Sequence, residues 1–287
     1  MAVDAAELRT EMAGLDALET DIKQKKSFVQ TVWPRLWPKL AALALAVGLW
    51  QLVVASHWRP DYVLPGPKAV GTELWHMVKN AAFWHAVART ARRAFGSYVI
   101  AMAVGGAIGA VVATSKPVRS AFGALITGLQ TMPSIAWFPL AVLLFKLSEG
   151  AITFVVVLGA APAIANGLID GVDHVPPLLV RAGRVMGARR VTLFRHVILP
   201  AALPSVLSGL KQAWAFAWRS LMAGELLAPS LGTSIGNRLK TAQDLNDATG
   251  LIAMMIVLLV IGLVVDAGFG AADNALRRRW GLVDPAT

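Results

Sequence analysis

The chain has 287 residues, of which 56% are hydrophobic and 15% are charged, with a net charge of +10 and no cysteine. A soluble domain of this size cannot bury so many apolar side chains, so the composition excludes a soluble protein and predicts a polytopic membrane protein. The missing cysteines exclude thiol chemistry and thiolate-bound zinc, and the positive charge requires no nucleic acid because Lys and Arg commonly flank membrane helices.

The first 39 residues are predicted to form a cytoplasmic segment ahead of a membrane domain that covers residues 40–287. Apolar residues recur at helical spacing between Leu8 and Ile22, just before three lysines. This pattern is typical of an amphipathic helix that lies on the membrane or on a neighbouring protein. A solvated tail is the alternative. Acidic residues stand where a signal peptide would carry basic ones, so no cleavable signal is expected.

Five apolar stretches are near the length of about 20 residues that a helix needs to cross the hydrocarbon core. They cover residues 40–56, 94–115, 120–145, 150–169 and 248–265. A sixth, residues 201–227, carries Lys211, Arg219 and Glu225, which must be kept away from lipid. The sequence therefore predicts an all-α fold with six transmembrane helices. A short external helix is expected over residues 68–80.

The distribution of Lys and Arg predicts that both termini are cytoplasmic, because the inward-facing segments then hold most of these residues. Arg89, Arg92 and Arg93 run against this rule, since they would lie at the outer end of the second span. Two interpretations are open for these three residues. Their side chains either extend to the membrane surface, or they form a basic funnel for anions.

Small and polar residues interrupt two of the predicted spans. Gly105 and Gly109 form a face on which another helix can pack closely, most simply within the same subunit. Gln130, Met132 and Pro133 break the third span near mid-depth. Because broken backbone is tolerated there only against protein or a watery cavity, this patch is either part of a transport pathway or a packed kink.

Enzyme chemistry is scarce in this sequence. Its five histidines are not paired at metal-ligand spacing, and no G-x-x-x-x-G-K-[ST] phosphate loop occurs. The chain is therefore expected not to be an enzyme and to bind no metal or cofactor. If transport uses ATP, another subunit must supply the ATPase.

A segment between two predicted spans reads VRAGRVMGARRVTLFRHVILPAALP from Val180 to Pro204. Ala182 and Gly183 precede Gly187 at a fixed spacing, and nine residues separate Gly187 from the run VILP that ends at Pro200. This spacing resembles the EAA loop of permease subunits of bacterial ABC importers. Arg181 stands where that loop has its glutamate, so a cap or salt bridge made by that glutamate is in doubt.

The resemblance implies a coupling helix that docks into the ATPase subunit. Small residues would let the partner approach closely, apolar side chains would insert, and arginines would meet acidic edges. The residues implied in coupling are Ala182, Gly183, Arg184, Gly187, Arg189, Arg190, Leu193, Phe194 and Pro200, with Val185 as a further apolar contact. An ordinary amphipathic loop helix anchored by lipid headgroups is the alternative.

Further motifs resemble the permeases of the nitrate, sulfonate and taurine importer group. They include VLPGP at residues 63–67, TARR at 90–93, MPSIAWFPL at 132–140 and Trp218-Arg219 ahead of Glu225. The resemblance implies a homodimer in the bacterial inner membrane, surrounded by lipid, with two ATPase subunits that use ATP and Mg and one external solute-binding protein. Such permeases often carry glycine where this chain has Lys146.

From these features we predict the membrane permease of an ATP-driven importer for a small anionic solute such as a sulfonate, taurine or nitrate. A charged residue at the centre of a span costs about 2.5–3.5 kcal/mol, so Arg219 should face a cavity or a carboxylate. The predicted pathway residues are Gln130, Met132, Pro133, Trp137, Trp218, Arg219 and Glu225. Alternatively, Arg219 pairs structurally with Glu225 or another acid, and Glu225 is an outer gate or a packing residue. A secondary transporter or channel, which needs no coupling helix, is the alternative function.

Overall fold

The computed structural model describes residues 28–114, 116–228 and 231–279, and these residues contain helices but no strand. The predicted helix between Leu8 and Ile22 lies outside the described residues. The chain divides into two compact units, Met1–Asp61 and Tyr62–Thr287. Five helices are long and apolar enough to cross a membrane, and a bent pair raises the number to six, in agreement with the predicted spans.

The first unit contains one described helix, α2, which spans Phe28–Ala55. Its residues 36–55 are apolar enough on average to cross a membrane, although they include Lys39 and Gln51. The predicted first span, residues 40–56, is confirmed. The apolar side chains of α2 are distributed around the whole helix, as expected for a helix that lies in lipid.

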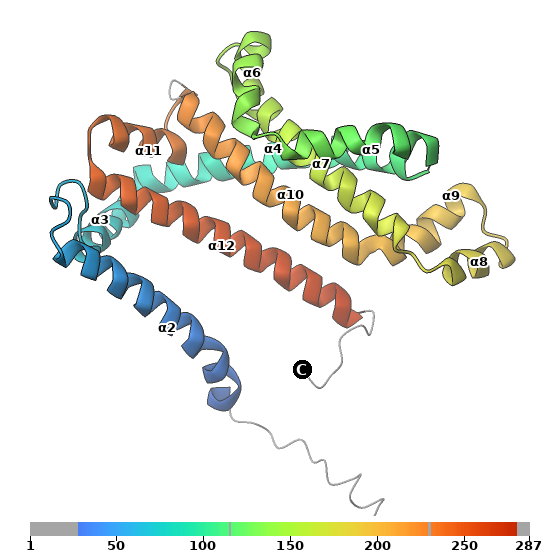
Figure 1. Ribbon diagram of the computed structural model, residues 1–287, viewed down its shortest axis with the longest axis horizontal. Coiled ribbons are helices and arrows are strands. Elements are labelled where there is room, and N and C mark those ends of the chain that lie inside the picture. The colour runs from blue at the N-terminus through green and yellow to red at the C-terminus, as the bar shows by residue number, and fades with distance from the viewer. Residues whose placement is uncertain (1–27, 115, 229–230, 280–287) are drawn as a thin grey trace, which may run out of the picture. The chain divides into compact units, whose positions relative to one another are not determined.

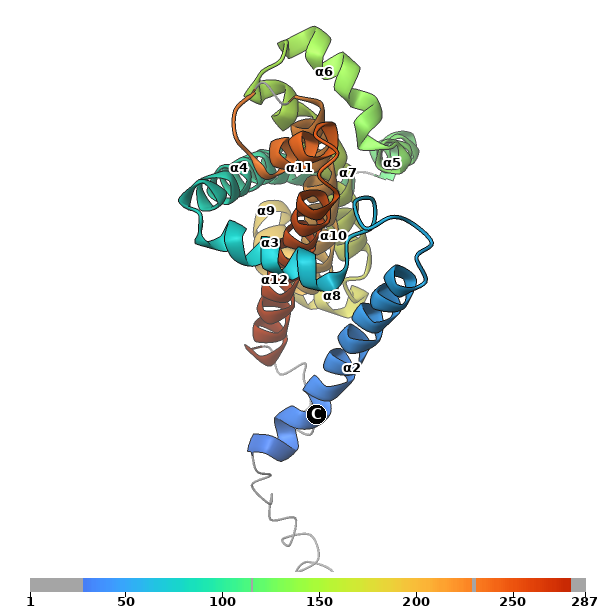
Figure 2. The ribbon, with the colours of Figure 1, turned by 90° about the vertical axis from the view of Figure 1, so that its left-hand side faces the viewer.

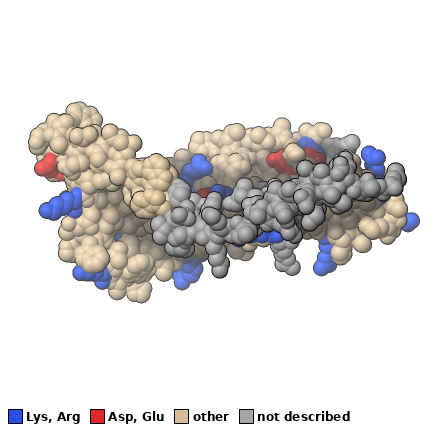
Figure 3. Space-filling model, turned by 90° about the horizontal axis from the view of Figure 1, so that it is seen from below, with Lys and Arg blue, Asp and Glu red and all other residues tan. Residues whose placement is uncertain are grey.

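The second unit holds the remaining helices (Figure 1). They are α3 (Pro67–Lys79), α4 (Ala81–Thr114), α5 (Lys116–Thr131), the 3-10 turn η1 (Ser134–Trp137), α6 (Phe138–Phe145), α7 (Glu149–Asp173), α8 (Pro177–Val185), α9 (Arg190–Leu193), the π-helical turn η2 (Phe194–Ile198), α10 (Leu199–Leu227), α11 (Ile235–Asp244) and α12 (Ala248–Arg279). The helix predicted over residues 68–80 is α3. On the face shown in Figure 3, charged side chains are few and scattered over a mainly uncharged surface.

Helix α7 is the centre of the second unit, because α4 and α10 both pack along it. In the most apolar 18-residue stretch of this helix, 67% of the residues are buried inside the protein. Gly105 and Gly109 of α4 lie against the backbone of Ala161 and Ala165, so the predicted small face is confirmed as packing within the subunit. On the opposite side, Gly167 of α7 touches Gly209 of α10, and a Cβ built on either would lie 2.6 Å from the other's Cα.

The predicted third span is broken where the sequence indicated. Helix α5 ends at Thr131, and the η1–α6 segment leaves it at an angle of 98° (Figure 2). Pro133 precedes the 3-10 turn and cannot donate a backbone hydrogen bond, which explains the break at this point. Met132 and Pro133 are exposed beside the bend.

Lys146 ends α6 in a backbone conformation that few residues other than glycine adopt, with φ of 57° and ψ of −167°. Such a conformation costs about 1–3 kcal/mol for a residue with a side chain. This conformation gives a physical reason for the glycine that the resemblance implied at this position.

We expect Lys146→Gly to stabilise the protein by about 1 kcal/mol, because glycine removes the strain but adds freedom to the unfolded chain. The midpoint of thermal unfolding of the detergent-solubilised protein should rise. Lys146→Ala, which keeps the Cβ, is the control and should bring no such gain. An equal rise for both substitutions would mean that the lysine side chain, and not the backbone, is responsible.

Candidate functional site

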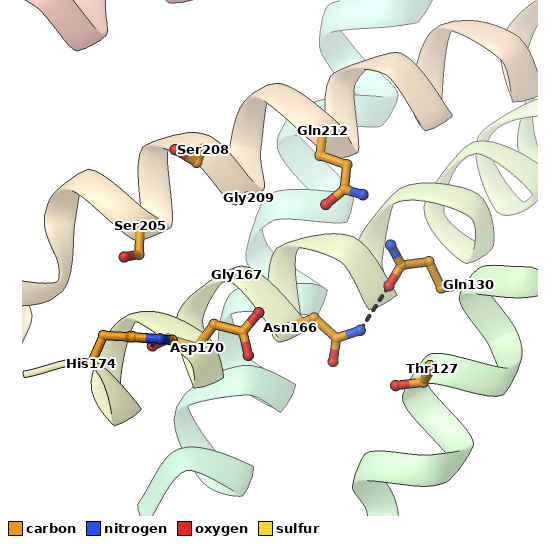
Figure 4. Close-up of a pocket in the computed structure, with 10 residues that line it drawn as sticks. All are labelled: Thr127, Gln130, Asn166, Gly167, Asp170, His174, Ser205, Ser208, Gly209 and Gln212. Atoms are coloured by element: carbon orange, nitrogen blue, oxygen red, sulfur yellow. Dashed lines mark hydrogen bonds between the residues drawn. The ribbon is translucent and has the colours of Figure 1, made fainter.

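A polar cavity of about 500 Å³ lies between α5, α7 and α10 (Figure 4). Nearly all of its lining side chains can form hydrogen bonds, although they belong to helices that are otherwise apolar. The lining residues are Thr127, Gln130, Asn166, Gly167, Asp170, His174, Ser205, Ser208, Gly209 and Gln212. Intramembrane polar groups of this kind face a bundle interior or a watery space and mark pathways for solutes.

Helical spacing and one close contact build this cavity. Asn166 and Asp170 of α7, and His174 at its C-terminal cap, follow one another at four-residue intervals and so lie on one side of the helix. Because Gly167 and Gly209 bring α7 and α10 into contact, the polar side chains beside the crossing come together. The amide of Asn166 donates a hydrogen bond of 2.7 Å to the side-chain oxygen of Gln130 on α5, as Figure 4 shows.

Of the predicted pathway residues, only Gln130 lines this cavity. Asn166, Asp170, Ser205, Ser208 and Gln212 were missed, although their helical spacing inside apolar spans was a usable signal. Trp137 packs, partly buried, against the main core, as does Trp218. Trp137 is therefore a packing residue, whereas Trp218 also borders a second hollow.

The polar face of α10 continues from the cavity to Arg219. Ser205, Gln212 and Arg219 are seven residues apart, so they lie along one stripe of the helix. Arg219 is exposed in the protomer, its Nε donates to the carbonyl of Ala215 at 3.0 Å, and its guanidinium lies 4.8 Å from the centre of the Phe216 ring. It borders the second hollow, of about 650 Å³, between α10 and α12.

The structure does not pair Arg219 with Glu225, which was the structural alternative predicted from the sequence. Glu225 is 1% exposed and instead binds Arg93 of α4, whose Nη1 lies 3.0 Å from its carboxylate. The hydroxyl of Thr90 and the backbone N–H of Gly236 also donate to this carboxylate. Glu225 is therefore a buried structural anchor, and its placement in a pathway is not supported.

Arg93 also binds a second carboxylate. Its Nε donates to Glu149, the first residue of α7, at 2.6 Å, and its Nη2 donates to the carbonyl of Leu231 at 2.9 Å. The Arg93 side chain is only 7% exposed. Neither interpretation made from the sequence holds for Arg93, because it neither reaches the membrane surface nor lines a funnel. Arg89 lies 3.7 Å from Glu149, and Arg92 is exposed.

The segment with the EAA-like spacing forms a short helical hairpin. Helix α8 ends in a Schellman motif, in which the N–H of Gly187 binds the carbonyl of Arg184 and the N–H of Ala188 binds that of Gly183. Gly187 has the left-handed φ of 86° that this cap requires. Glycine occurs at this position of the motif because it adopts that conformation without a Cβ clash.

The hairpin turns some of the predicted coupling residues inward. Gly183 is buried against Leu193 and Val197, and Leu193 is 7% exposed, so neither can contact a partner directly. Phe194 and Pro200 are partly buried, whereas Ala182, Arg184 and Arg189 are exposed. The Arg190 side chain lies outside the described side chains. The apolar groups that project are Val185, Met186 and Val191, which are 88%, 78% and 75% exposed.

We expect Gly187→Ala to destabilise the end of α8 by about 1–2 kcal/mol, because a residue with a Cβ resists the left-handed conformation. No atom lies within 4 Å of a Cβ at this position, so the effect would come from the backbone alone. Gly187→Asn, which tolerates this conformation, should lose less. Hydrogen exchange of the hairpin amides would measure the difference, and equal protection in both variants would contradict the cap assignment.

Several known proteins are similar to this chain in sequence, and others are similar in fold. Residues 102–278 match the family described as binding-protein-dependent transport system inner membrane component. The chain is 31% identical to a protein of Methanocaldococcus jannaschii named as an ABC transporter permease, over 80% of this chain and 87% of that one. It is 28% identical to the nitrate import permease NrtB of Leptolyngbya laminosa (81% and 85%) and 26% identical to the taurine permease TauC of Escherichia coli (85% and 91%).

The methionine ABC transporter MetNI, solved in inward-facing conformations, contains a similar fold. Its TM-score is 0.60 at 18% identity, over 68% of this chain and 96% of that one. The matched family covers more than half of the chain, from within α4 to the end of α12. The chain therefore belongs to the inner membrane components of binding-protein-dependent transport systems, and it is a multi-pass permease similar to those of the nitrate, sulfonate and taurine group.

Proposed function

We propose that two copies of this chain form the pathway of an ATP-driven importer for a small solute that an external binding protein delivers. Two ATPase subunits would bind ATP and Mg on the cytoplasmic side, where we also place both termini. The named relatives transport nitrate or taurine, which supports a solute with an oxyanion group. The exposed guanidinium of Arg219 is suited to attract that group.

One observation carries this proposal: the second arm of the exposed hairpin, α9 and η2, runs directly into the helix that carries the polar stripe. From Val191 to Leu227 the chain forms one span of 37 residues, which begins beside the projecting side chains and passes Ser205, Gln212 and Arg219. A partner that pulls on the hairpin would therefore shift one wall of the cavity. ATP-driven closure of the partner could bias the pathway between two states in this way.

The coupling role can be tested without disturbing the fold. Because Val185 and Met186 project into solvent, replacing both with aspartate should leave the folded protein intact but abolish co-purification of the partner ATPase subunit. Leu245→Asp, at a position 72% exposed beyond α11, is the matched control and should retain the ATPase. Solute uptake that survives both the double substitution and ATP depletion would instead support a secondary transporter or channel.

Arg219→Ala is expected to reduce uptake at least tenfold while the ATPase still co-purifies, because the charge that attracts the oxyanion is lost. Arg219→Lys should retain part of the uptake, since it keeps the charge but not the planar group. Arg92→Ala removes another exposed arginine and serves as the control. Normal uptake by the Arg219→Ala variant would remove this residue from the pathway.

A further inference from the structure

An ion pair joins the two helices that border the second hollow. The Nζ of Lys211 on α10 lies 3.0 Å from Oδ1 of Asp266 on α12, and their side chains are 46% and 57% exposed. Both residues belong to helices that are long and apolar enough to cross a membrane. An ion pair this exposed contributes little to stability where water surrounds it. Because charged residues in such helices commonly mark the path of a solute, the pair is a candidate for a functional role.

Only one member of this ion pair lines the second hollow. The described lining is mainly apolar and contains two charged side chains, those of Arg219 from α10 and Asp266 from α12, but not that of Lys211. Arg219 and Asp266 carry opposite charges, so by themselves they would leave the hollow without a net charge. With Lys211 beside Asp266, two positive charges face one negative charge, and the cluster carries a net charge of +1.

The structure keeps Asp266 away from Arg219 although both line the same hollow. The guanidinium of Arg219 contacts the carbonyl of Ala215 and the ring of Phe216, and it has no ion pair with any residue that the structure describes. The carboxylate of Asp266 is bound to Lys211 instead, eight residues or about 12 Å of helix from Arg219. Without Lys211, this carboxylate would attract the guanidinium, and an anionic solute would lose its binding charge.

We infer that Lys211 is a positioning residue that sets the charge selectivity of the pathway: it holds Asp266, so that Arg219 stays free and the hollow attracts a small oxyanion. This inference rests on the proposed function and adds to it a residue that does not touch the solute. Lys211 acts through Asp266 and does not bind the anion itself. The arrangement also explains how an acidic residue can border the path of an anion.

Because the chain has no cysteine, a single cysteine can report the charge of the hollow. Leu263→Cys is suitable, since Leu263 lines the hollow, is 60% exposed and precedes Asp266 by about one turn of α12. We would measure its reaction rates in the solubilised protein with two methanethiosulfonate reagents, one carrying sulfonate and one carrying trimethylammonium. Lys211→Met should lower the ratio of the anionic to the cationic rate about tenfold, because the cluster loses its net charge. Lys211→Arg should keep the ratio.

Neutralising Asp266 separates this role from two alternatives. Asp266→Asn alone should raise the ratio, and the double substitution Lys211→Met/Asp266→Asn should restore it, because Arg219 is then free again. If Lys211 bound the anion itself, the double variant would remain as low as Lys211→Met. If the ion pair only supported the fold, the two single substitutions would change the ratio in the same direction. Either result would overturn the inference.

The control is Lys240→Met, which breaks a second exposed ion pair, with Asp244 on α11, outside the lining of the hollow. It should leave the ratio unchanged. A ratio that Lys211→Met does not change would overturn the inference. So would a cysteine at position 263 that reacts with neither reagent, because water would then not reach the hollow. These rates require no solute and no partner subunit, so they decide the role of Lys211 even if the proposed function fails.

Uptake into cells that express the complete transporter tests the consequence for transport. The probes are nitrate and ethanesulfonate, two small oxyanions that carry no positive charge. Lys211→Met should lower about tenfold the uptake of the anion that wild-type cells accumulate, and the double substitution should restore most of it. Loss without restoration would overturn the inference, as would undiminished uptake by the Lys211→Met variant.

Two further outcomes concern the proposed function alone. Wild-type cells that accumulate neither anion would contradict its substrate class, and uptake that survives ATP depletion would contradict its energy source. In both cases the reaction rates at Leu263→Cys would still show whether Lys211 sets the charge of the hollow, so a failure of the proposed function can be told apart from a failure of the inference.

Discussion

Glu225→Ala is expected to destabilise the protein by about 3–5 kcal/mol, because three buried donors lose this acceptor at a cost of about 1–3 kcal/mol each. The carboxylate accepts hydrogen bonds from three groups: Arg93, the Thr90 hydroxyl and the Gly236 N–H. All three would lose their acceptor in a place that water does not reach. Glu149 would still hold Arg93, so the guanidinium would not be left without a counter-charge.

The measurement is the thermal unfolding midpoint of the solubilised protein, which should fall by about 10 °C at roughly 2–4 °C per kcal/mol. Glu225→Gln keeps one acceptor oxygen and should cost less. The control is Asp244→Ala, which breaks the exposed Lys240–Asp244 pair and should cost at most about 0.5 kcal/mol. A similar fall for both alanine variants would show that the Arg93 network does not anchor the fold.

Gly167→Ala is expected to cost about 1–3 kcal/mol, because the added Cβ would meet the backbone of α10. A backbone atom cannot rotate away as a side chain can, so the two helices must separate. Close contact of small residues is a principal source of helix association in membranes, and its loss would weaken the centre of the bundle. Gly209→Ala should behave alike, since it meets Gly167 at the same distance.

Gly106→Ala on α4 is the matched control, because no atom lies within 4 Å of a Cβ at that position. It should be neutral or slightly stabilising, since alanine favours helix more than glycine does. Unfolding midpoints of the three variants would decide the matter. If Gly167→Ala is as stable as Gly106→Ala, the two helices do not cross as closely as the structure places them.

The spans could be predicted well from the sequence, because the length and hydropathy of a segment are local properties and they decide whether it can cross the hydrocarbon core. Its main error concerns the start of the second span, which was predicted at residue 94, whereas α4 begins at Ala81. The arginines at positions 89, 92 and 93 interrupt the apolar run but not the helix. Arg93 is accommodated because Glu149 and Glu225 neutralise it, and these residues lie far from it along the chain.

In the coupling segment, too, local features were predictable from the sequence and long-range contacts were not. Motif spacing identified the hairpin, and Gly187 stands where the chain needs a left-handed residue, which is a local requirement. The prediction that Gly183 and Leu193 contact a partner was wrong, because α8 packs against α9 and η2 and both residues are buried between them. Which face of a short helix remains exposed depends on what packs against the other.

By itself, the sequence determined the helical class, the break before Pro133, the motif spacing that marks the permease family and the presence of an arginine in the sixth span. Only the tertiary structure decided that Glu225 pairs with Arg93, that Asn166 binds Gln130, and that the Asp170 side chain lines a cavity. The reason is physical. Runs of apolar residues and left-handed turns depend on neighbours in sequence, whereas the partner of a charge depends on which helix faces meet, and here the Gly167–Gly209 contact sets those faces.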